Sequence, residues 1–408
     1  MAAHTQPEIS DSGTIEIKTG FQSCRYSKAE TATMQPLPSS HTHVWLKRLQ
    51  QSCGTIYWRQ AVLSAPAILI VLAVSLKLDP IIAVIMVGAA FSVGFGAART
   101  LIGRRWGAMG MATLGMALAA FGGSLIGLHP SAALATATLL AAACAALSSY
   151  NNDWWWVALQ IVIAFLVAGY YPNSFEFAAL RGLLVLLGGG LQIAITMLLA
   201  RLTPASAQPL PPAAATALPG GHLIRFTLAS ALAVAASFYI AEHVGLKNNY
   251  WAAMTVLLVL RPAAHDTLVR GSSRLVGTLA GCALATLLVY AFHDSLHMLV
   301  LCLTLASAAA FSMQKAHYAL LTSMISASIV FLLAIGHGDP LATTEHRLAA
   351  TLLGGAMACD GARIPSVMQI QLHFRQPACN QCPELNFITI TPEIISIAPS
   401  QRPNEVGS

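Results

Sequence analysis

Twelve long apolar runs constrain the fold of this chain more than any other feature. The first covers residues 61–76, the last covers residues 348–359, and most contain 16 to 22 residues. A helix needs about 20 apolar residues to cross a hydrocarbon core of about 30 Å. Because the runs are continuously apolar instead of alternating with polar residues, they predict membrane helices and not the strands of a barrel. We expect an all-α polytopic membrane protein with ten to twelve spans.

Charged residues are scarce along the chain. They make up 9% of it, whereas hydrophobic residues make up 56%, and an ordinary soluble domain carries about 25% charged residues. So little charge could not cover the surface of a soluble protein of 408 residues, which predicts that lipid surrounds most of the chain. The net charge of +6 does not indicate nucleic-acid binding, because the cations lie at the ends of apolar runs and not together on one soluble face.

The chain contains an internal repeat. The motif Arg-x-x-x-x-Leu-Leu-Gly-Gly begins at Arg181 and recurs at Arg347, about 166 residues later. An Arg-x-x-Gly motif occurs at Arg104 and again at Arg274, about 170 residues later. Each half carries six apolar runs in the same order, and an even number of spans makes the halves parallel. The predicted fold is therefore two tandem, parallel-repeat bundles of about six transmembrane helices each, with a substrate site between them.

The runs divide the chain into five segments. We expect a disordered cytoplasmic segment at residues 1–56, a first transmembrane repeat at 57–201, a Pro/Ala-rich cytoplasmic linker at 202–222, a second transmembrane repeat at 223–359 and a disordered polar tail at 360–408. The last apolar run contains only about 12 residues before Asp360, which is too short to cross a bilayer unaided. It is either a truncated final helix or a natural partial span.

The cations favour one side of the membrane. If the N-terminus is cytoplasmic, most arginines and lysines at the run ends fall on the cytoplasmic side. The other side then holds few cations (Lys77, Arg181, Lys247 and Arg347) and six acidic residues (Asp79, Glu176, Glu242, Asp294, Asp339 and Glu345). This positive-inside pattern predicts that both termini and the linker lie in the cytoplasm.

The most unusual cation follows the apolar run at residues 250–260. Tyr250 and Trp251 are typical of a membrane interface, and Arg261 lies about 16 Å further along a helix, near mid-depth. Pro262 removes a helix hydrogen bond, so a break is expected there. A broken helix with a cation near the midplane suits an anion, because charge at that depth is costly and seldom kept without a use.

The residues after Pro262 leave an alternative open. His265 and Asp266 would form a proton relay if they share the membrane depth of Arg261. Alternatively, the helix is short, ends at Leu260, and is followed by a cytoplasmic loop that reaches Arg274.

Two further pairs of residues follow in the same region. Arg270 and Arg274 lie one helical turn apart, and they are either anchors at the cytoplasmic surface or an entry funnel for carboxylates, which arginine binds through two parallel hydrogen bonds. Gly277 and Gly281 are predicted to be packing residues that let two helices approach closely.

The chain lacks the motifs of common enzymes and cofactor sites. It contains no P-loop, no Gly-x-Ser-x-Gly and no His-Glu-x-x-His motif. A single Cys379-x-x-Cys382 without a second ligand pair is weak evidence for zinc. We therefore expect no catalytic residue, no cofactor and no metal site.

One region resembles a known family. The sequence Asn-Asn-Tyr-Trp-Ala-Ala-Met-Thr-Val-Leu-Leu-Val-Leu-Arg-Pro from Asn248, followed by Arg-Leu-Val-Gly-Thr-Leu-Ala-Gly from Arg274, resembles the fusaric acid resistance (FUSC-like) family, which is related to bacterial aromatic acid exporters. The resemblance implies an inner-membrane protein of Gram-negative bacteria that exports aromatic carboxylic acids, in some cases with a periplasmic adaptor protein. Several relatives carry a sizeable cytoplasmic domain after the first half, where this chain has only the linker.

These observations predict an inner-membrane transporter that exports small organic anions, with aromatic carboxylic acids as the class that the resemblance implies. Its substrate-binding residues are expected to be Arg261, Tyr250, Trp251, Arg270 and Arg274. Its expected partners are membrane lipid, the anion, and a periplasmic adaptor or a second copy of the chain. The alternative is a non-transporting membrane subunit that scaffolds an envelope complex.

Overall fold

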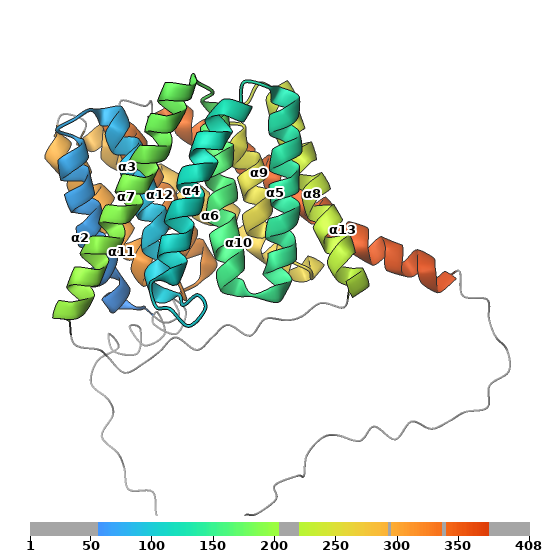
Figure 1. Cartoon of the computed structure of the whole chain (residues 1–408). Helices are drawn as coiled ribbons and strands as arrows, with labels where there is room; N and C mark the ends of the chain where they lie inside the picture. Colours follow the sequence, from blue (N-terminus) through green and yellow to red (C-terminus); the bar gives the residue numbers. More distant parts are fainter. Residues whose placement is uncertain (1–55, 204–219, 293–294, 337–339, 375–408) are drawn as a thin grey trace, which may run out of the picture. The chain divides into compact units, whose positions relative to one another are not determined.

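A computed structural model describes residues 56–203, 220–292, 295–336 and 340–374. All regular structure in these residues is helical, and the only strand-like pairing there is one isolated bridge between Leu101 and Arg104 (Figure 1). Nine helices of the described residues are long and apolar enough to cross a membrane. The prediction of an all-α polytopic membrane protein is thereby confirmed.

Helices α2 to α7 form the first set. Their bounds are α2 Trp58–Ser75, α3 Pro80–Gly94, α4 Gly107–Ile126, α5 Pro130–Tyr150, α6 Asn152–Tyr170 and α7 Phe175–Leu202, with a 3-10 turn, η1 Phe95–Ala98, after α3. Prolines occupy the first position of α3 and α5, where the missing amide hydrogen removes no helical bond. The Asp79 carboxylate caps α3 by accepting a hydrogen bond of 2.7 Å from the amide of Ile81.

Helices α8 to α13 form the second set. Their bounds are α8 Gly220–His243, α9 Tyr250–Val259, α10 Ala264–Ala291, α11 Leu296–Ser312, α12 Tyr318–Ile335 and α13 Pro340–Phe374. The shorter apolar helices are α9, with 10 residues, and α11, with 17. At 1.5 Å per residue, α9 is about 15 Å long, or about half of a hydrocarbon core.

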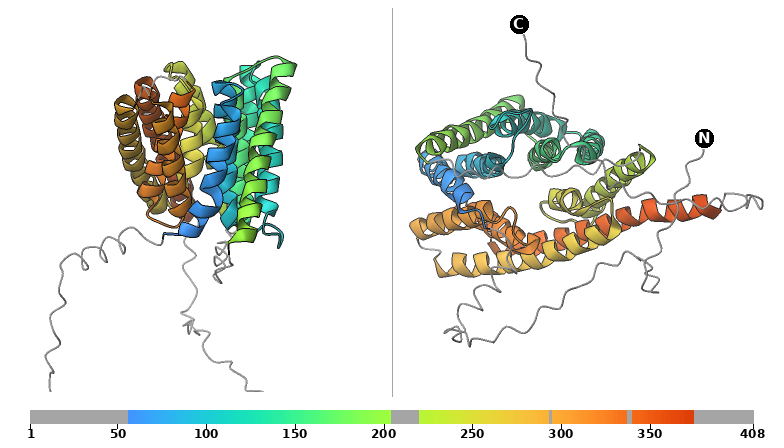
Figure 2. Two further views of the ribbon diagram at one scale, coloured as in Figure 1. Left: turned by 90° about the vertical axis from the view of Figure 1, so that its left-hand side faces the viewer. Right: turned by 90° about the horizontal axis from the view of Figure 1, so that it is seen from below.

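Helices pair in the same order within each set. In the first set, α4 packs against α6 and α7, and α7 packs against α2 and α3; in the second set, α10 packs against α12 and α13, and α13 packs against α8 and α9. Between the sets, α2 contacts α11 and α5 contacts α8. Figure 2 shows the two sets as two adjacent layers, one coloured blue to green and the other yellow to red.

The apolar core crosses the boundary between the two sets. Phe311 of α11 is fully buried, and its ring centre lies 5.5 Å from that of Phe91 in α3 and 5.0 Å from that of Phe95 in η1. Phe311 thereby packs the second set against the first.

A glycine on the last helix of each set permits close contact with a neighbouring helix. A Cβ atom at Gly188 of α7 would overlap the backbone of Met86 in α3, and one at Gly354 of α13 would overlap the carbonyl oxygen of Ala252 in α9. Only glycine allows these backbones to approach so closely.

Helix α13 is longer than the apolar run that begins it. It continues through Asp360 and Pro365 to Phe374, so the expected end of the helix after Cys359 is not what the structure shows. Its last turns extend beyond the other helices in Figure 1. The length of an apolar run shows how much of a segment can contact lipid. A helix is held by its own backbone hydrogen bonds, so α13 can continue past the apolar run into polar residues. Cys379 and Cys382, which gave only weak evidence for zinc, lie outside the described residues, within the undescribed segments 1–55, 204–219, 293–294, 337–339 and 375–408.

Candidate anion site

Helix α9 breaks just before Pro262. It ends at Val259, Leu260 is extended with φ −60° and ψ 129°, and α10 begins at Ala264. Proline has no amide hydrogen and disfavours helical geometry in the residue before it. Neither alternative from the sequence describes this outcome fully. Helix α9 is short, but most of the segment up to Arg274 is helix and not loop.

Thr267 holds the broken segment in place from the first turn of α10. Its fully buried hydroxyl accepts a hydrogen bond of 2.9 Å from the amide of Arg261. The same hydroxyl lies 3.1 Å from the carbonyl oxygen of Arg261 and 3.2 Å from that of Ala263, and it donates to one of them. The threonine thus replaces backbone hydrogen bonds that the break removes. Sequence analysis missed Thr267, although a hydroxyl residue in the first turn after a helix-breaking proline was a usable signal.

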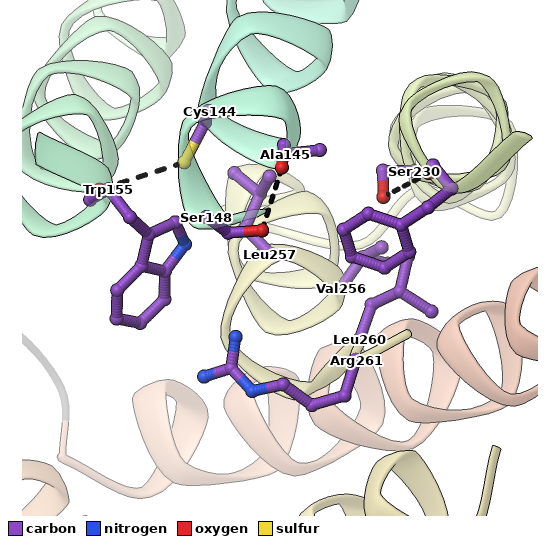
Figure 3. Close-up of a pocket in the computed structure, with 10 residues that line it drawn as sticks. Cys144, Ala145, Ser148, Trp155, Ser230, Val256, Leu257, Leu260 and Arg261 are labelled. Atoms are coloured by element: carbon purple, nitrogen blue, oxygen red, sulfur yellow. Dashed lines mark hydrogen bonds between the residues drawn. The ribbon is translucent and has the colours of Figure 1, made fainter. Parts of the chain in front are cut away.

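The Arg261 side chain borders a small cavity between the two sets of helices. Its guanidinium lies 4.7 Å from the ring centre of Trp155 in α6. Figure 3 shows Cys144 and Ser148 of α5 and Ser230 of α8 around the cavity. The volume of about 10 Å³ holds about one water molecule, whereas pockets for organic ligands have about 300 Å³ or more. In this conformation the cavity is too small for an organic anion.

Arginine side chains are effectively always protonated in proteins, so Arg261 carries a positive charge at this position. Among the described residues, no carboxylate forms an ion pair with its guanidinium. Its positive charge therefore lies at the boundary between the two sets without an acidic partner.

Arg270 and Arg274 extend this basic region along α10. The Arg270 guanidinium lies 4.4 Å from the ring centre of Tyr318 in α12. Arg274 is only 6% exposed, and the Nε atoms of both arginines are buried without a hydrogen-bond partner. Arginines that anchor a helix at the membrane surface extend into water, whereas burying an unpaired charge is costly. Arg274 is therefore not an ordinary surface anchor.

Tyr250 and Trp251 lie at the other end of α9, about 15 Å from Arg261 along the helix axis. Both are buried, and the Tyr250 ring packs at 5.4 Å from the ring of Tyr170. The Arg347 guanidinium of α13 lies 4.7 Å from the ring centre of Trp251. The expected substrate residues thus form two groups at the two ends of α9. Arg347 belongs to the second group, although the sequence marked it only as part of a repeat and as a cation on the non-cytoplasmic side, and not as a substrate residue.

His265 and Asp266 lie on the first turn of α10. Their side chains are 86% and 66% exposed, and the His265 Nδ1 is 3.6 Å from a carboxylate oxygen of Asp266. Neither residue lines the cavity beside Arg261. The structure brings the two side chains near each other but does not join them to that cavity.

Gly277 and Gly281 face α12. A Cβ atom at Gly277 would overlap the carbonyl oxygen of Ala319, and one at Gly281 would overlap that of Ser323. The two glycines let α10 and α12 approach closely, and this contact lies beside the stacking of Arg270 on Tyr318.

The segment that contains these arginines matches a known family. A family model described as fusaric acid resistance protein-like matches residues 232–359. The chain carries a fusaric acid resistance protein-like domain. The resemblance found in the sequence is confirmed, and the match extends further toward the C-terminus than the motifs that first indicated it.

Two curated proteins are similar to part of the chain. An uncharacterized protein of Synechocystis sp. is 31% identical over 140 residues, and an uncharacterized protein of Haemophilus influenzae is 27% identical over 137 residues. The alignments cover 33% and 34% of this chain but only 18% of each relative, so the chain spans less than a fifth of the length of these relatives. No solved structure matches the chain.

The fusaric acid resistance protein-like domain supplies the basic residues of the candidate site. Arg261, Arg270, Arg274 and Arg347 all lie within it, whereas Trp155 comes from α6, outside the match. The cavity beside Arg261 is therefore formed jointly by this domain and the helices that precede it.

Proposed function

We propose that the protein is a bacterial inner-membrane transporter that exports small organic anions, with aromatic carboxylic acids as the leading substrate class. The fusaric acid resistance protein-like domain and the nine helices suited to a membrane support transport. One observation carries the choice of anions. Four buried or half-buried arginines of this domain form no ion pair with any described carboxylate (Arg261, Arg270, Arg274 and Arg347). Such unbalanced positive charge in a membrane protein attracts anions.

Transport would proceed by alternating access between two tandem, parallel repeats. The common order of helix pairing in the two sets supports this arrangement. So do the glycine contacts, because Gly188 and Gly354 are 166 residues apart and so are the residues that they contact, Met86 and Ala252. The small cavity beside Arg261 lies at the boundary of the two sets, where rocking of one set against the other would open it.

Substitution of Arg261 tests the function. Export of radiolabelled benzoate from proteoliposomes should be lost in Arg261→Ala, because the anion loses a positively charged contact, and partly retained in Arg261→Lys. Arg201→Ala, which removes an exposed cation at the end of α7, is the matched control and should export normally. Normal export by correctly inserted Arg261→Ala would remove Arg261 from the site, and no export by the unsubstituted chain would contradict the function.

A membrane scaffold without transport activity is the second candidate. The small size of the cavity favours it, because an anion of aromatic size does not fit in this conformation. Cysteine substitutions at positions 258–266 discriminate between the two candidates. In a transporter, a water-soluble thiol reagent should label them and benzoate should slow the labelling, whereas in a scaffold benzoate should have no effect.

The same proposal includes the orientation of the protein in the membrane and the coupling of export to protons. Both termini lie in the cytoplasm, and the carboxyl end of α9 faces that side. Proton coupling through His265 and Asp266 would then take place at the cytoplasmic surface, because both side chains are exposed. A periplasmic adaptor or a second copy of the chain would be the protein partner.

A further inference from the structure

Arg347 and Arg181 occupy equivalent places in the two sets of helices. Each begins a copy of the same motif near the start of the last helix of its set. Seven residues later, on the same face of the helix, Gly188 packs against α3 and Gly354 packs against α9. The two arginines therefore have equivalent backbone positions, and they differ in the residues that surround their side chains.

Arg181 is bound by the protein itself. The two hydrogens of its Nη1 are shared among the hydroxyl of Ser124 at 2.5 Å, the carbonyl oxygen of Tyr171 at 2.5 Å and that of Ala168 at 3.3 Å. These contacts tie α7 to α4 and to the end of α6. The role of Arg181 is structural.

Arg347 has no such contacts. It is 3% exposed, its guanidinium lies on the Trp251 ring, and its buried Nη1 has no hydrogen-bond partner. Arg274 lies on α10, which packs against α13; it is 6% exposed, and its Nε has no hydrogen-bond partner. No carboxylate of the described residues pairs with either cation. Two buried like charges with unused donors are costly to keep unless an anion joins them.

We propose that Arg347 and Arg274 bind a planar organic monocarboxylate between α9, α10 and α13. The Arg347 guanidinium lies over the Trp251 ring, 4.7 Å from its centre, and its planar fork of donors fits the two oxygens of a carboxylate. The neighbouring rings of Tyr250 and Trp251 are buried, which favours a monoanion with an apolar body over a strongly hydrated phosphate dianion.

This site deepens the proposed function and rests on it. Arg261 and Arg270 lie toward one end of α9, and Arg347 lies at the other end, beside Trp251. An anion that passes along α9 would therefore meet a cation at each end, with Arg274 adding a further buried cation on α10. The site at Arg347 faces the side opposite to Arg261 and would hold the anion before release.

Thermal unfolding of the full chain in detergent tests the site. At constant ionic strength, benzoate should raise the Tm, because a ligand that binds the folded state stabilises it, and the uncharged isostere benzamide should not. In Arg347→Gln, the benzoate concentration that gives the same shift should increase by about tenfold or more. The matched variant Arg181→Gln should keep the benzoate shift.

The two variants should also differ without ligand. Arg181→Gln should lower the Tm because the hydrogen bonds of its Nη1 are lost, whereas Arg347→Gln should not, because it removes a buried charge that has no partner. Arg347→Lys keeps the charge but not the planar fork, and it should bind benzoate more weakly than the unsubstituted chain.

Several results would overturn this inference. An unchanged benzoate shift in Arg347→Gln would place the ligand elsewhere and leave the proposed transport function standing, and loss of the fold in Arg347→Gln would make the residue structural. Inorganic phosphate that stabilises as well as benzoate would overturn the assignment to carboxylates. If the unsubstituted chain showed neither benzoate export nor a benzoate shift, the proposed function would fail together with this site.

Discussion

Thr267 explains how the chain can leave helical geometry between two apolar helices. Around Pro262, backbone amide and carbonyl groups lose their helical partners, and unpartnered groups are costly where water is excluded. The Thr267 hydroxyl supplies both a donor and an acceptor within one turn, at 2.9 to 3.2 Å. The position of the Arg261 side chain therefore depends on a neutral residue that does not itself face the cavity.

Substitution of Thr267 should expose this dependence. Thr267→Val keeps the shape of the side chain but leaves the amide of Arg261 unpartnered, so we expect a loss of about 1–3 kcal/mol in the free energy of unfolding and weaker benzoate export. Thr267→Ser keeps the hydroxyl and should stay close to the unsubstituted chain in Tm and in export. A valine variant that matches the serine variant in both measurements would show that the hydroxyl does not hold the break.

At the scale of elements, the contact of α13 with α9 decides where Arg347 lies. Gly354 lets the backbone of α13 approach the carbonyl oxygen of Ala252, and this close approach brings Arg347 onto the ring of Trp251. The adjacent Gly355 faces open space, because no atom lies within 4 Å of the place that a methyl group would take there. Two neighbouring glycines thus have different roles, which allows a matched comparison.

Alanine substitutions at the two glycines should have opposite effects. In Gly354→Ala, the new methyl group would push α13 away from α9, and we expect a loss of about 1–3 kcal/mol in the free energy of unfolding. In Gly355→Ala, the methyl group meets nothing, and the higher helix propensity of alanine should leave stability unchanged or raise it by up to about 1 kcal/mol. Tm measurements on the two variants in one detergent decide the matter, and equal values would show that the helices are not in close contact there.

At the scale of the whole molecule, the helices alternate in direction through the described residues. The segment between α2 and α3 and the segment between α3 and α4 therefore lie on opposite sides of the membrane. Lys77 is exposed on the first of these segments, and Arg105 is exposed on the second. If the positive-inside pattern holds, we expect Arg105 in the cytoplasm and Lys77 on the other side.

Cysteine labelling tests this orientation. In cells with a permeable outer membrane, a membrane-impermeant maleimide should label Lys77→Cys, and it should label Arg105→Cys only after the inner membrane is opened. The unsubstituted chain, with its eight cysteines, gives the background. The reverse pattern would contradict cytoplasmic termini and would turn the basic end of α9 toward the outside.

The sequence by itself determined that lipid surrounds the chain, that its spanning segments are helices, and that the chain breaks before Pro262. Apolar runs of helical length require lipid, and lipid requires that each spanning segment satisfy its own backbone, so helices follow from local chemistry. The interruption of α9 before Pro262 also follows locally, because a proline ring acts on its nearest neighbours. The family resemblance was available from the residues between Asn248 and Gly281 for the same reason, as short motifs within one stretch of chain.

Only the tertiary structure decided which arginines are bound by the protein and which are not. Arg181 and Arg347 share one motif, yet only Arg181 meets a hydroxyl and carbonyl groups, and its partner Ser124 is 57 residues away in the chain. The packing of α13 against α9 and α10, and the stacking of Arg347 on Trp251, likewise depend on helices that are distant in sequence. Hydrogen-bond partners are set by which helices pack together, and packing is a property of the whole fold that no single motif contains.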